Sequence, residues 1–188
     1  MARPKKATVA LIYDFDGTLS PGNMQEYGFI QAAGLDANTF WEKNTKMKEA
    51  QDASEILCYM KLMITEASHK GLLLTKSSLK EYGKNVELFQ GVKDWFTLIN
   101  KYGADNGIII EHYINSSGLK EIIEGTPIAK EFKHIYACSF FYSPEGKAEW
   151  PAVAVDFTAK TQFLFMINKG IRYVKDNKKV NEFKPDIE

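Results

Sequence analysis

Apolar and polar positions divide the chain into short buried strands and amphipathic helices. The apolar run over 9–13 stops abruptly at Asp14 and is typical of a strand buried on both faces of a parallel sheet. A second apolar run, over 107–115, stops at Ser116, and an amphipathic helix over 91–103 leads directly into it. A helix, a short loop and a strand in this order predict a right-handed crossover. The pattern therefore predicts an α/β fold.

The rest of the pattern extends this fold without adding a repeat. Nearly all of 24–90 is predicted to be helical, and 119–125 is predicted to be a short helix. Two strands joined by a Ser-Pro-Glu-Gly-Lys turn predict a β-hairpin over 135–157. A further helix over 161–169 is followed, from 172 onward, by a polar, lysine-rich segment without another apolar strand.

Composition narrows the class of protein. The 188 residues, 45% of them apolar, fit one domain or a core with a modest insertion. Lysine plus arginine and aspartate plus glutamate each number 24, so net charge favours neither nucleic acid nor an anionic membrane as partner. No segment reaches the roughly 18 apolar residues of a membrane span. We interpret Cys58 and Cys138 as buried thiols, with a disulfide as the alternative, and expect a soluble cytoplasmic protein.

Asp14 and Asp16 are the strongest chemical signal in the sequence. Two carboxylates this close repel each other, so their placement just after a strand favours a site for a divalent cation and a phosphoryl group. Asp14 could attack phosphorus, while Asp16 could protonate the leaving oxygen and later activate water. An isolated Asp-x-Asp-Gly is more often a turn or a calcium-binding loop, but the preceding strand and the following Thr-Leu favour the catalytic interpretation.

A phosphate-binding region is predicted where the second strand ends. Ser116, Ser117 and Gly118 precede a helix, whose first N–H groups could bind phosphoryl oxygens. Ser116 could instead be only a helix cap, and Ser117 is its rival. Lys160 lies near the start of the last predicted helix and could neutralise charge on the nucleophile and the phosphate. It could also be a surface lysine, with Lys169 as its rival.

These motifs in this order resemble a known family. The stretch Asp14-x-Asp16-Gly17-Thr18 after an apolar strand, then Ser116, then Lys160, is similar to the first three motifs of the haloacid dehalogenase (HAD) superfamily. The hairpin before Lys160 resembles the phosphoserine-phosphatase-like branch. The acid at position 16 favours phosphate chemistry over dehalogenation, because the dehalogenases of the superfamily lack it.

The resemblance implies a Rossmann-like, three-layer parallel sheet. The core would comprise 1–23 and 91–188, with a helical cap at 24–90. It implies a Mg²⁺-dependent phosphatase of a small phosphorylated metabolite, working through an aspartyl-phosphate, with Asp14 and Asp16 as metal ligands. A phosphotransferase or mutase is the alternative within the superfamily, and a non-catalytic phosphate-binding protein is the alternative outside it.

One departure from the family concerns its fourth motif, a strand followed by an acidic pair that completes the metal site. Asp186 and Glu188 follow no apolar strand, so we expect them not to replace it. Either the core is incomplete at its C-terminus, or the protein is a natural variant with impaired metal binding. We expect weak Mg²⁺ binding, an exposed sheet edge that favours self-association, and Asp156 as the first candidate for a substitute acid.

Overall fold

A computed structural model describes residues 6–182 of the chain as an α/β fold around one four-stranded sheet. The strand order is β1-β2-β3-β4; the first three strands are parallel, and β4 returns antiparallel to β3. This last pair is the predicted hairpin. The strands are β1 (Thr8–Tyr13), β2 (Ile109–Leu119), β3 (His134–Tyr142) and β4 (Ala148–Val153).

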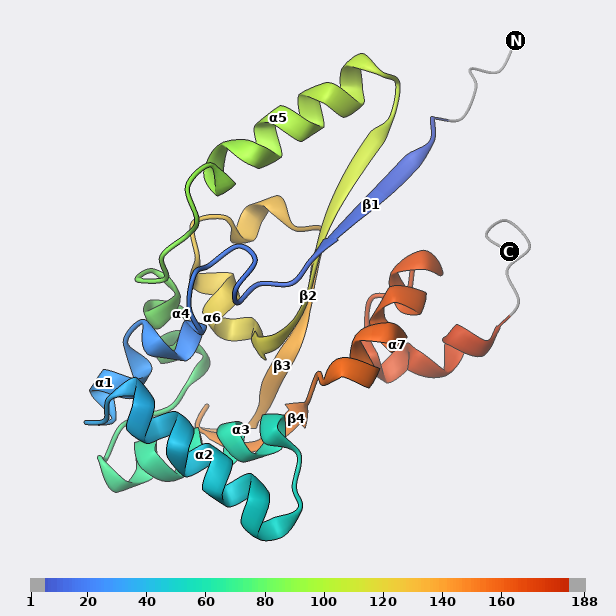
Figure 1. The fold of residues 1–188 in the computed structure, drawn as a ribbon. Coiled ribbons are helices and arrows are strands. Elements are labelled where there is room, and N and C mark those ends of the chain that lie inside the picture. Colours follow the sequence, from blue (N-terminus) through green and yellow to red (C-terminus); the bar gives the residue numbers. More distant parts are fainter. Residues whose placement is uncertain (1–5, 183–188) are drawn as a thin grey trace.

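Helices lie on both sides of the sheet, which makes three layers (Figure 1). On one side are α4 (Lys76–Gly83), α5 (Val92–Asp105) and α6 (Lys120–Gly125), and on the other is α7 (Phe157–Asn168). Phe96 of α5 is buried against the β2 side chain of His112 and against Phe132. The predicted layered α/β architecture is confirmed. Short 3₁₀ helices are η1 (Met24–Glu26), η2 (Ala129–Glu131) and η3 (Val174–Asn181).

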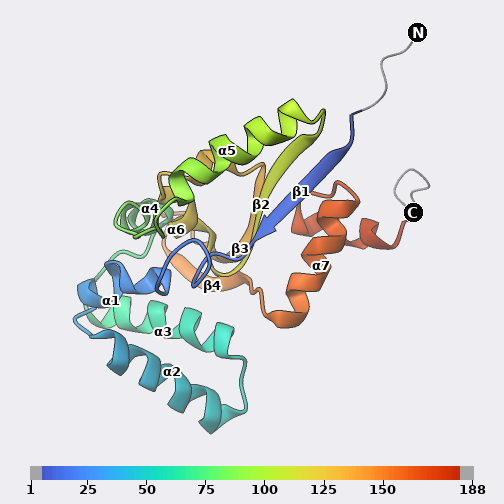
Figure 2. The same cartoon turned by 45° about the horizontal axis from the view of Figure 1, so that its top comes forward.

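The segment between β1 and α5 is helical, as predicted. Its helices α1 (Phe29–Ala32), α2 (Ala37–Gln51) and α3 (Glu55–His69) lie beyond the carboxyl ends of the parallel strands (Figures 1 and 2). In contrast, α4 packs tightly on α6 of the core. A Cβ atom added at Gly83 would lie 2.1 Å from the Ile122 carbonyl oxygen, so only glycine allows this approach. That 24–90 forms a separate cap domain stays a prediction.

The prediction that β1 is buried on both faces is wrong. Residues 8–10 are exposed and residues 11–13 are only partly buried. The reason is that β1 lies at the edge of the described sheet, while the flanking helices α5 and α7 pack mainly on β2, so the faces of β1 are left poorly covered. A purely apolar run therefore marks an edge strand here. Self-association at this edge stays a prediction.

The second strand is longer than the apolar run that predicts it. We expected it to stop at Ser116, but β2 continues through Ser117 and Gly118 to Leu119. Its register with β3 shifts between Asn115 and Leu119, so regular pairing is interrupted over the intervening serines. This irregular end of the strand, and not a helix N-terminus, carries Ser116, Ser117 and Gly118.

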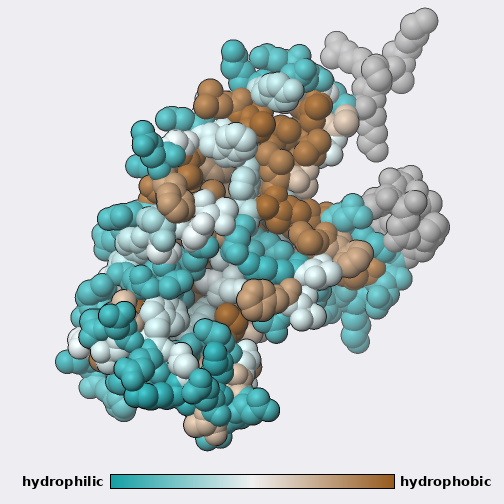
Figure 3. Space-filling model, viewed as in Figure 1, coloured by the Kyte–Doolittle hydropathy of each residue, from teal (hydrophilic) through white to brown (hydrophobic). Residues whose placement is uncertain are grey.

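Apolar side chains also reach the surface. Figure 3 shows them gathered around β1 and α5 and continuing toward α7. Val9 of β1, Leu98 of α5 and Ile109 of β2 are among the exposed apolar residues. Among the residues that the structure describes, no helix is both long and apolar enough to cross a membrane. Cys58 and Cys138 are buried free thiols, as predicted.

Candidate active site

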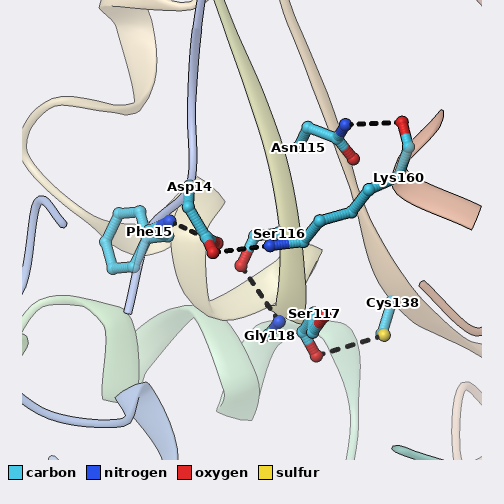
Figure 4. A network of polar contacts seen from close by, with 8 residues as sticks. All are labelled: Asp14, Phe15, Asn115, Ser116, Ser117, Gly118, Cys138 and Lys160. Carbon is cyan, nitrogen blue, oxygen red and sulfur yellow. Dashed lines mark hydrogen bonds and ion pairs between the residues drawn. The ribbon is translucent and has the colours of Figure 1, made fainter. Parts of the chain in front are cut away.

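Asp14 and Lys160 meet at the carboxyl end of β1 (Figure 4). The Lys160 ammonium Nζ donates to Asp14 Oδ2 at 2.5 Å, and the Phe15 backbone N–H donates to Asp14 Oδ1 at 2.8 Å. The Asp14 side chain is 42% exposed and that of Lys160 is 24% exposed, so a ligand can reach the pair. The neighbouring Phe15 is fully buried and anchors the loop that carries both aspartates.

Asp16 is held by the loop that follows it. The Met24 backbone N–H donates to Asp16 Oδ1 at 3.0 Å, and Gly17 adopts a left-handed φ of +73° that an L side chain would disfavour. Burial is the main cause that raises the pKa of Asp16 to about 7, and the negative charge of Asp14 adds to it. With this pKa, the Asp16 carboxyl group is partly protonated at neutral pH.

Ser116, Ser117 and Gly118 lie beside the two aspartates. The buried Ser116 Oγ accepts the Gly118 N–H at 3.0 Å, so this N–H already has a partner. The Ser117 carbonyl accepts from the Tyr59 hydroxyl at 2.8 Å and from Cys138 Sγ at 3.2 Å. These contacts tie the end of β2 to α3 and to β3, which fixes the serine segment as one wall of the site.

Gly118 leaves no space for a side chain. A Cβ atom there would lie 2.0 Å from Met24 Cε and 3.0 Å from Asp16 Oδ2. Met24 is fully buried, and its sulfur accepts the Leu119 N–H at 3.0 Å. Met24 therefore holds the Asp16 loop and the end of β2 together, a role for which the sequence gives no local signal.

The structure distinguishes between the rival lysines. Lys160 lies in the first turn of α7, which begins with the Asp156 carboxylate capping the Ala159 N–H at 2.8 Å. Asn115 Nδ2 donates to the Lys160 carbonyl at 2.9 Å and so fixes this turn to β2. Lys169, at the far end of α7, donates instead to the Glu182 carbonyl, so it is not part of the site.

The alternative acid Asp156 does not join the site. Asp156 is exposed and serves as the N-cap of α7, and it is not among the residues that line the cavity at Asp14. Asp186 and Glu188 lie outside the described residues. Asn115 was missed by the sequence analysis, although a polar residue at the end of an apolar strand, directly before Ser116, was a usable signal.

A cavity of about 190 Å³ opens over the two aspartates. Its walls come from both aspartates, from the segment 116–118 and from the helices beyond the strand ends. The cavity thus unites every predicted site residue except Lys160, which reaches Asp14 from α7. Its residues are Asp14, Asp16, Asn23, Gln25, Trp41, Glu55, Ile56, Tyr59, Ser116, Ser117 and Gly118.

The oxygen atoms of this cavity fit a hard cation. Asp14 could offer its carboxylate and Asp16 its backbone carbonyl oxygen, both oxygen ligands of the kind that Mg²⁺ prefers, which leaves the Asp16 carboxyl group to carry a proton. Asp16 Oδ1 already accepts the Met24 N–H, and Asp14 Oδ2 accepts from Lys160. In the part of the chain that the structure describes, no cluster of three or more His, Cys, Asp or Glu side chains is placed to hold a metal. Substrate or water oxygens would have to complete the coordination.

Comparisons with solved structures identify the fold. A HAD family hydrolase from Salmonella enterica serovar Typhi matches 93% of this chain with a TM-score of 0.62 and 13% identity. A phosphoserine phosphatase with bound substrate matches 93% of the chain with a TM-score of 0.58 and 15% identity. The chain therefore has the fold of the HAD superfamily in its phosphoserine-phosphatase-like form, as the motifs predicted.

A further structure and a relative extend this result. A phosphoserine phosphohydrolase-like protein from Francisella tularensis matches 78% of the chain with 22% identity and a TM-score of 0.51. The chain belongs to the same family as an uncharacterized protein of Borreliella burgdorferi, with 30% identity over 209 residues that cover 95% of this chain and 70% of that protein. The chain spans 64% of the Francisella structure and 55% of the Salmonella structure. No model of a protein family matches the chain.

Proposed function

We propose that this protein is a Mg²⁺-dependent hydrolase of small phosphomonoesters that works through an aspartyl-phosphate intermediate. The observation that carries the proposal is the pair of Asp14 and Lys160, with Nζ and Oδ2 2.5 Å apart at the rim of a cavity that Asp16 also lines. A carboxylate, a cation and a second acid in one cavity are the groups that phosphoryl transfer to a carboxylate needs.

In the first step, Asp14 attacks phosphorus and forms a new P–O bond, while the bond between phosphorus and the substrate oxygen breaks. Lys160 offsets negative charge on the Asp14 carboxylate and on the phosphoryl oxygens. Asp16 gives its proton to the leaving oxygen, which departs as an alcohol. The raised pKa of Asp16, about 7, keeps much of this group protonated at neutral pH for that task.

In the second step, water attacks the phosphorus of the intermediate. Asp16, now ionised, takes the proton of the water, and the bond between phosphorus and Asp14 breaks to release inorganic phosphate. Asp14 returns as a carboxylate and Asp16 as an acid. Bound Mg²⁺, held by the Asp14 carboxylate and the Asp16 backbone carbonyl, would supply positive charge to the phosphoryl oxygens and offset the repulsion between carboxylate and phosphate.

Two other functions use the same residues. In a phosphotransferase or mutase, a substrate hydroxyl would replace water in the second step. In a phosphate-binding protein without turnover, the cavity would hold its ligand. Among the described residues, no group of three or more acidic, His or Cys side chains is placed to hold a metal ion, which favours this alternative. The position of Asp16 beside Asp14, where it could act as acid and base, favours hydrolysis over ligand binding without turnover.

The test is hydrolysis of p-nitrophenyl phosphate with added MgCl₂, compared between the wild type and Asp14→Asn. We expect turnover by the wild type and none by the variant, because an amide is a poor nucleophile. Asp94→Asn, on the exposed part of α5, is the matched control and should keep full activity. Equal activity of Asp14→Asn and wild type would contradict the assigned nucleophile. Binding of phosphate esters without turnover by the wild type would favour the binding protein.

A further inference from the structure

The cavity extends from the aspartates toward α2 and α3, and this outer part has a definite chemistry. It is formed by Gln25, Trp41, Glu55 and Tyr59 together with Asn23 and Ile56. At about 190 Å³ the cavity is smaller than the roughly 300–1,000 Å³ of sites for drug-sized ligands. A cavity of this size accommodates a phosphate group with a short substituent.

The charge of the outer part is negative. Of the residues that line the cavity in the described chain, none is lysine, arginine or histidine, while the exposed Glu55 is among them. Lys48 lies 3.4 Å from Glu55, but both side chains are substantially exposed, so this pair is weak. Glu26 adds a further carboxylate directly behind Trp41, whose indole Nε1–H donates to Glu26 Oε1 at 2.7 Å.

The aromatic walls have no spare polar group for an anion. The Trp41 N–H is bound to Glu26, and the Tyr59 hydroxyl is bound to the Ser117 carbonyl. The two rings lie 6.3 Å apart between centroids at an interplanar angle of 70°. What they can offer a ligand is electron-rich ring surface, which attracts cations.

Gln25 adds an unused hydrogen-bond acceptor. Its side chain is 2% exposed and lines the cavity, and its Oε1 has no hydrogen-bond partner. A buried carbonyl oxygen without a donor is costly unless a ligand supplies one. The exposed carboxylate of Glu55, two aromatic rings and a carbonyl oxygen without a donor all favour a cationic group that donates N–H bonds.

We propose that the substrates are phosphate monoesters of amino alcohols, with the phosphate at Asp14 and Lys160 and the ammonium group between Trp41, Glu55 and Gln25. This inference rests on the proposed function. It differs from recognition of phosphoserine, because the outer cavity offers no cation for a substrate carboxylate. An amino alcohol without a carboxylate fits both the charge and the size of the cavity.

The test compares three esters of the same length that differ in terminal charge: 2-aminoethyl phosphate, 2-hydroxyethyl phosphate and phosphoglycolate. With MgCl₂ present, kcat/KM should be highest for the amine and lowest for the carboxylate, and phosphoserine should be poorer than 2-aminoethyl phosphate. In Glu55→Gln the ratio of kcat/KM between the amine and the hydroxyl ester should fall about two- to fivefold, the scale of an exposed ion pair. Glu42→Gln, an equal charge change on α2 and outside the cavity lining, should leave this ratio unchanged.

Binding separates the two proposals. Asp14→Asn, which we expect to be inactive, should gain more thermal stability from 2-aminoethyl phosphate than from 2-hydroxyethyl phosphate. Equal kcat/KM for the three esters, with no difference in binding, would overturn the amino alcohol assignment and leave hydrolysis standing. Preferred binding of the amine without turnover by the wild type would overturn hydrolysis and leave the ligand class standing.

Discussion

Lys160 Nζ and Asp14 Oδ2 lie 2.5 Å apart although 146 residues separate them along the chain. Two connections bring about this contact. Parallel pairing of β1 with β2 places Asp14 beside the end of β2, and Asn115 on β2 binds the Lys160 carbonyl. The ion pair thus depends on the sheet and on the placement of α7, and it joins the first strand to the last long helix.

Replacement of Lys160 should lower activity without unfolding the protein. In Lys160→Met, kcat/KM for p-nitrophenyl phosphate should fall about 10²-fold, because a fixed charge no longer faces the phosphoryl group. Lys169→Met should instead keep kcat/KM and lower the melting temperature, since Lys169 is buried and bonds to the Glu182 carbonyl. Steady-state kinetics and thermal unfolding on both variants check this. The opposite outcome would assign the phosphate contact to Lys169.

Replacement of Asp16 should affect poor leaving groups most. Asp16→Asn removes the acid that protonates the departing oxygen, so alkyl phosphates should lose about 10²–10⁴ in kcat. The kcat for p-nitrophenyl phosphate should fall less, because p-nitrophenolate is a weak base that can leave without being protonated. The measurement is kcat for a series of esters with graded leaving-group pKa. An equal loss across the series would mean that Asp16 acts only on the structure or on metal binding.

The same substitution should stabilise the metal-free protein at alkaline pH. The pKa of Asp16 is about 7 in the folded state and 3.8 as its ordinary value, so the folded protein retains this proton between these pH values. Stability therefore falls as pH rises from 3.8 through 7, by on the order of 4 kcal/mol in all. Asn keeps an acceptor for the Met24 N–H but does not ionise.

With EDTA present, Asp16→Asn should thus unfold at higher denaturant concentration than wild type at pH 8, and at a similar concentration at pH 4. Urea unfolding at the two pH values measures the difference. Asp94→Asn, an exposed aspartate on α5, should behave like wild type at both. A constant difference between Asp16→Asn and wild type at the two pH values would contradict the assigned pKa.

Two glycine substitutions separate site geometry from backbone strain. Gly118→Ala would push Met24 and Asp16 apart, and kcat should fall by about tenfold or more, since small misplacements of reacting groups are costly. Gly107→Ala meets no atom within 4 Å but sits at a φ of +71°, so it should cost about 1–2 kcal/mol of stability and keep kcat. Activity and unfolding of both variants are the measurements. Full activity of Gly118→Ala would show that the close contact is unimportant.

Local signals were enough to predict much of the site. The motif Asp14-x-Asp16-Gly17 after a strand predicts that both aspartates lie close together, because they are neighbours in the sequence. The hairpin of β3 and β4, the helix before β2 and the apolar character of Cys58 and Cys138 follow from short-range pattern in the same way. The catalytic roles of Asp14 and Asp16 stay predictions.

The sequence alone determined the order of the elements and the identity of the acidic pair, because both depend on neighbouring residues. Tertiary structure decided which lysine reaches Asp14, and it made an apolar run an edge strand. It also decided that Trp41 and Tyr59 share a cavity with residues far away in the chain. Such contacts depend on how the layers of the fold pack together. The spacing of residues along one segment predicts its secondary structure, but it does not predict against which other segment it packs.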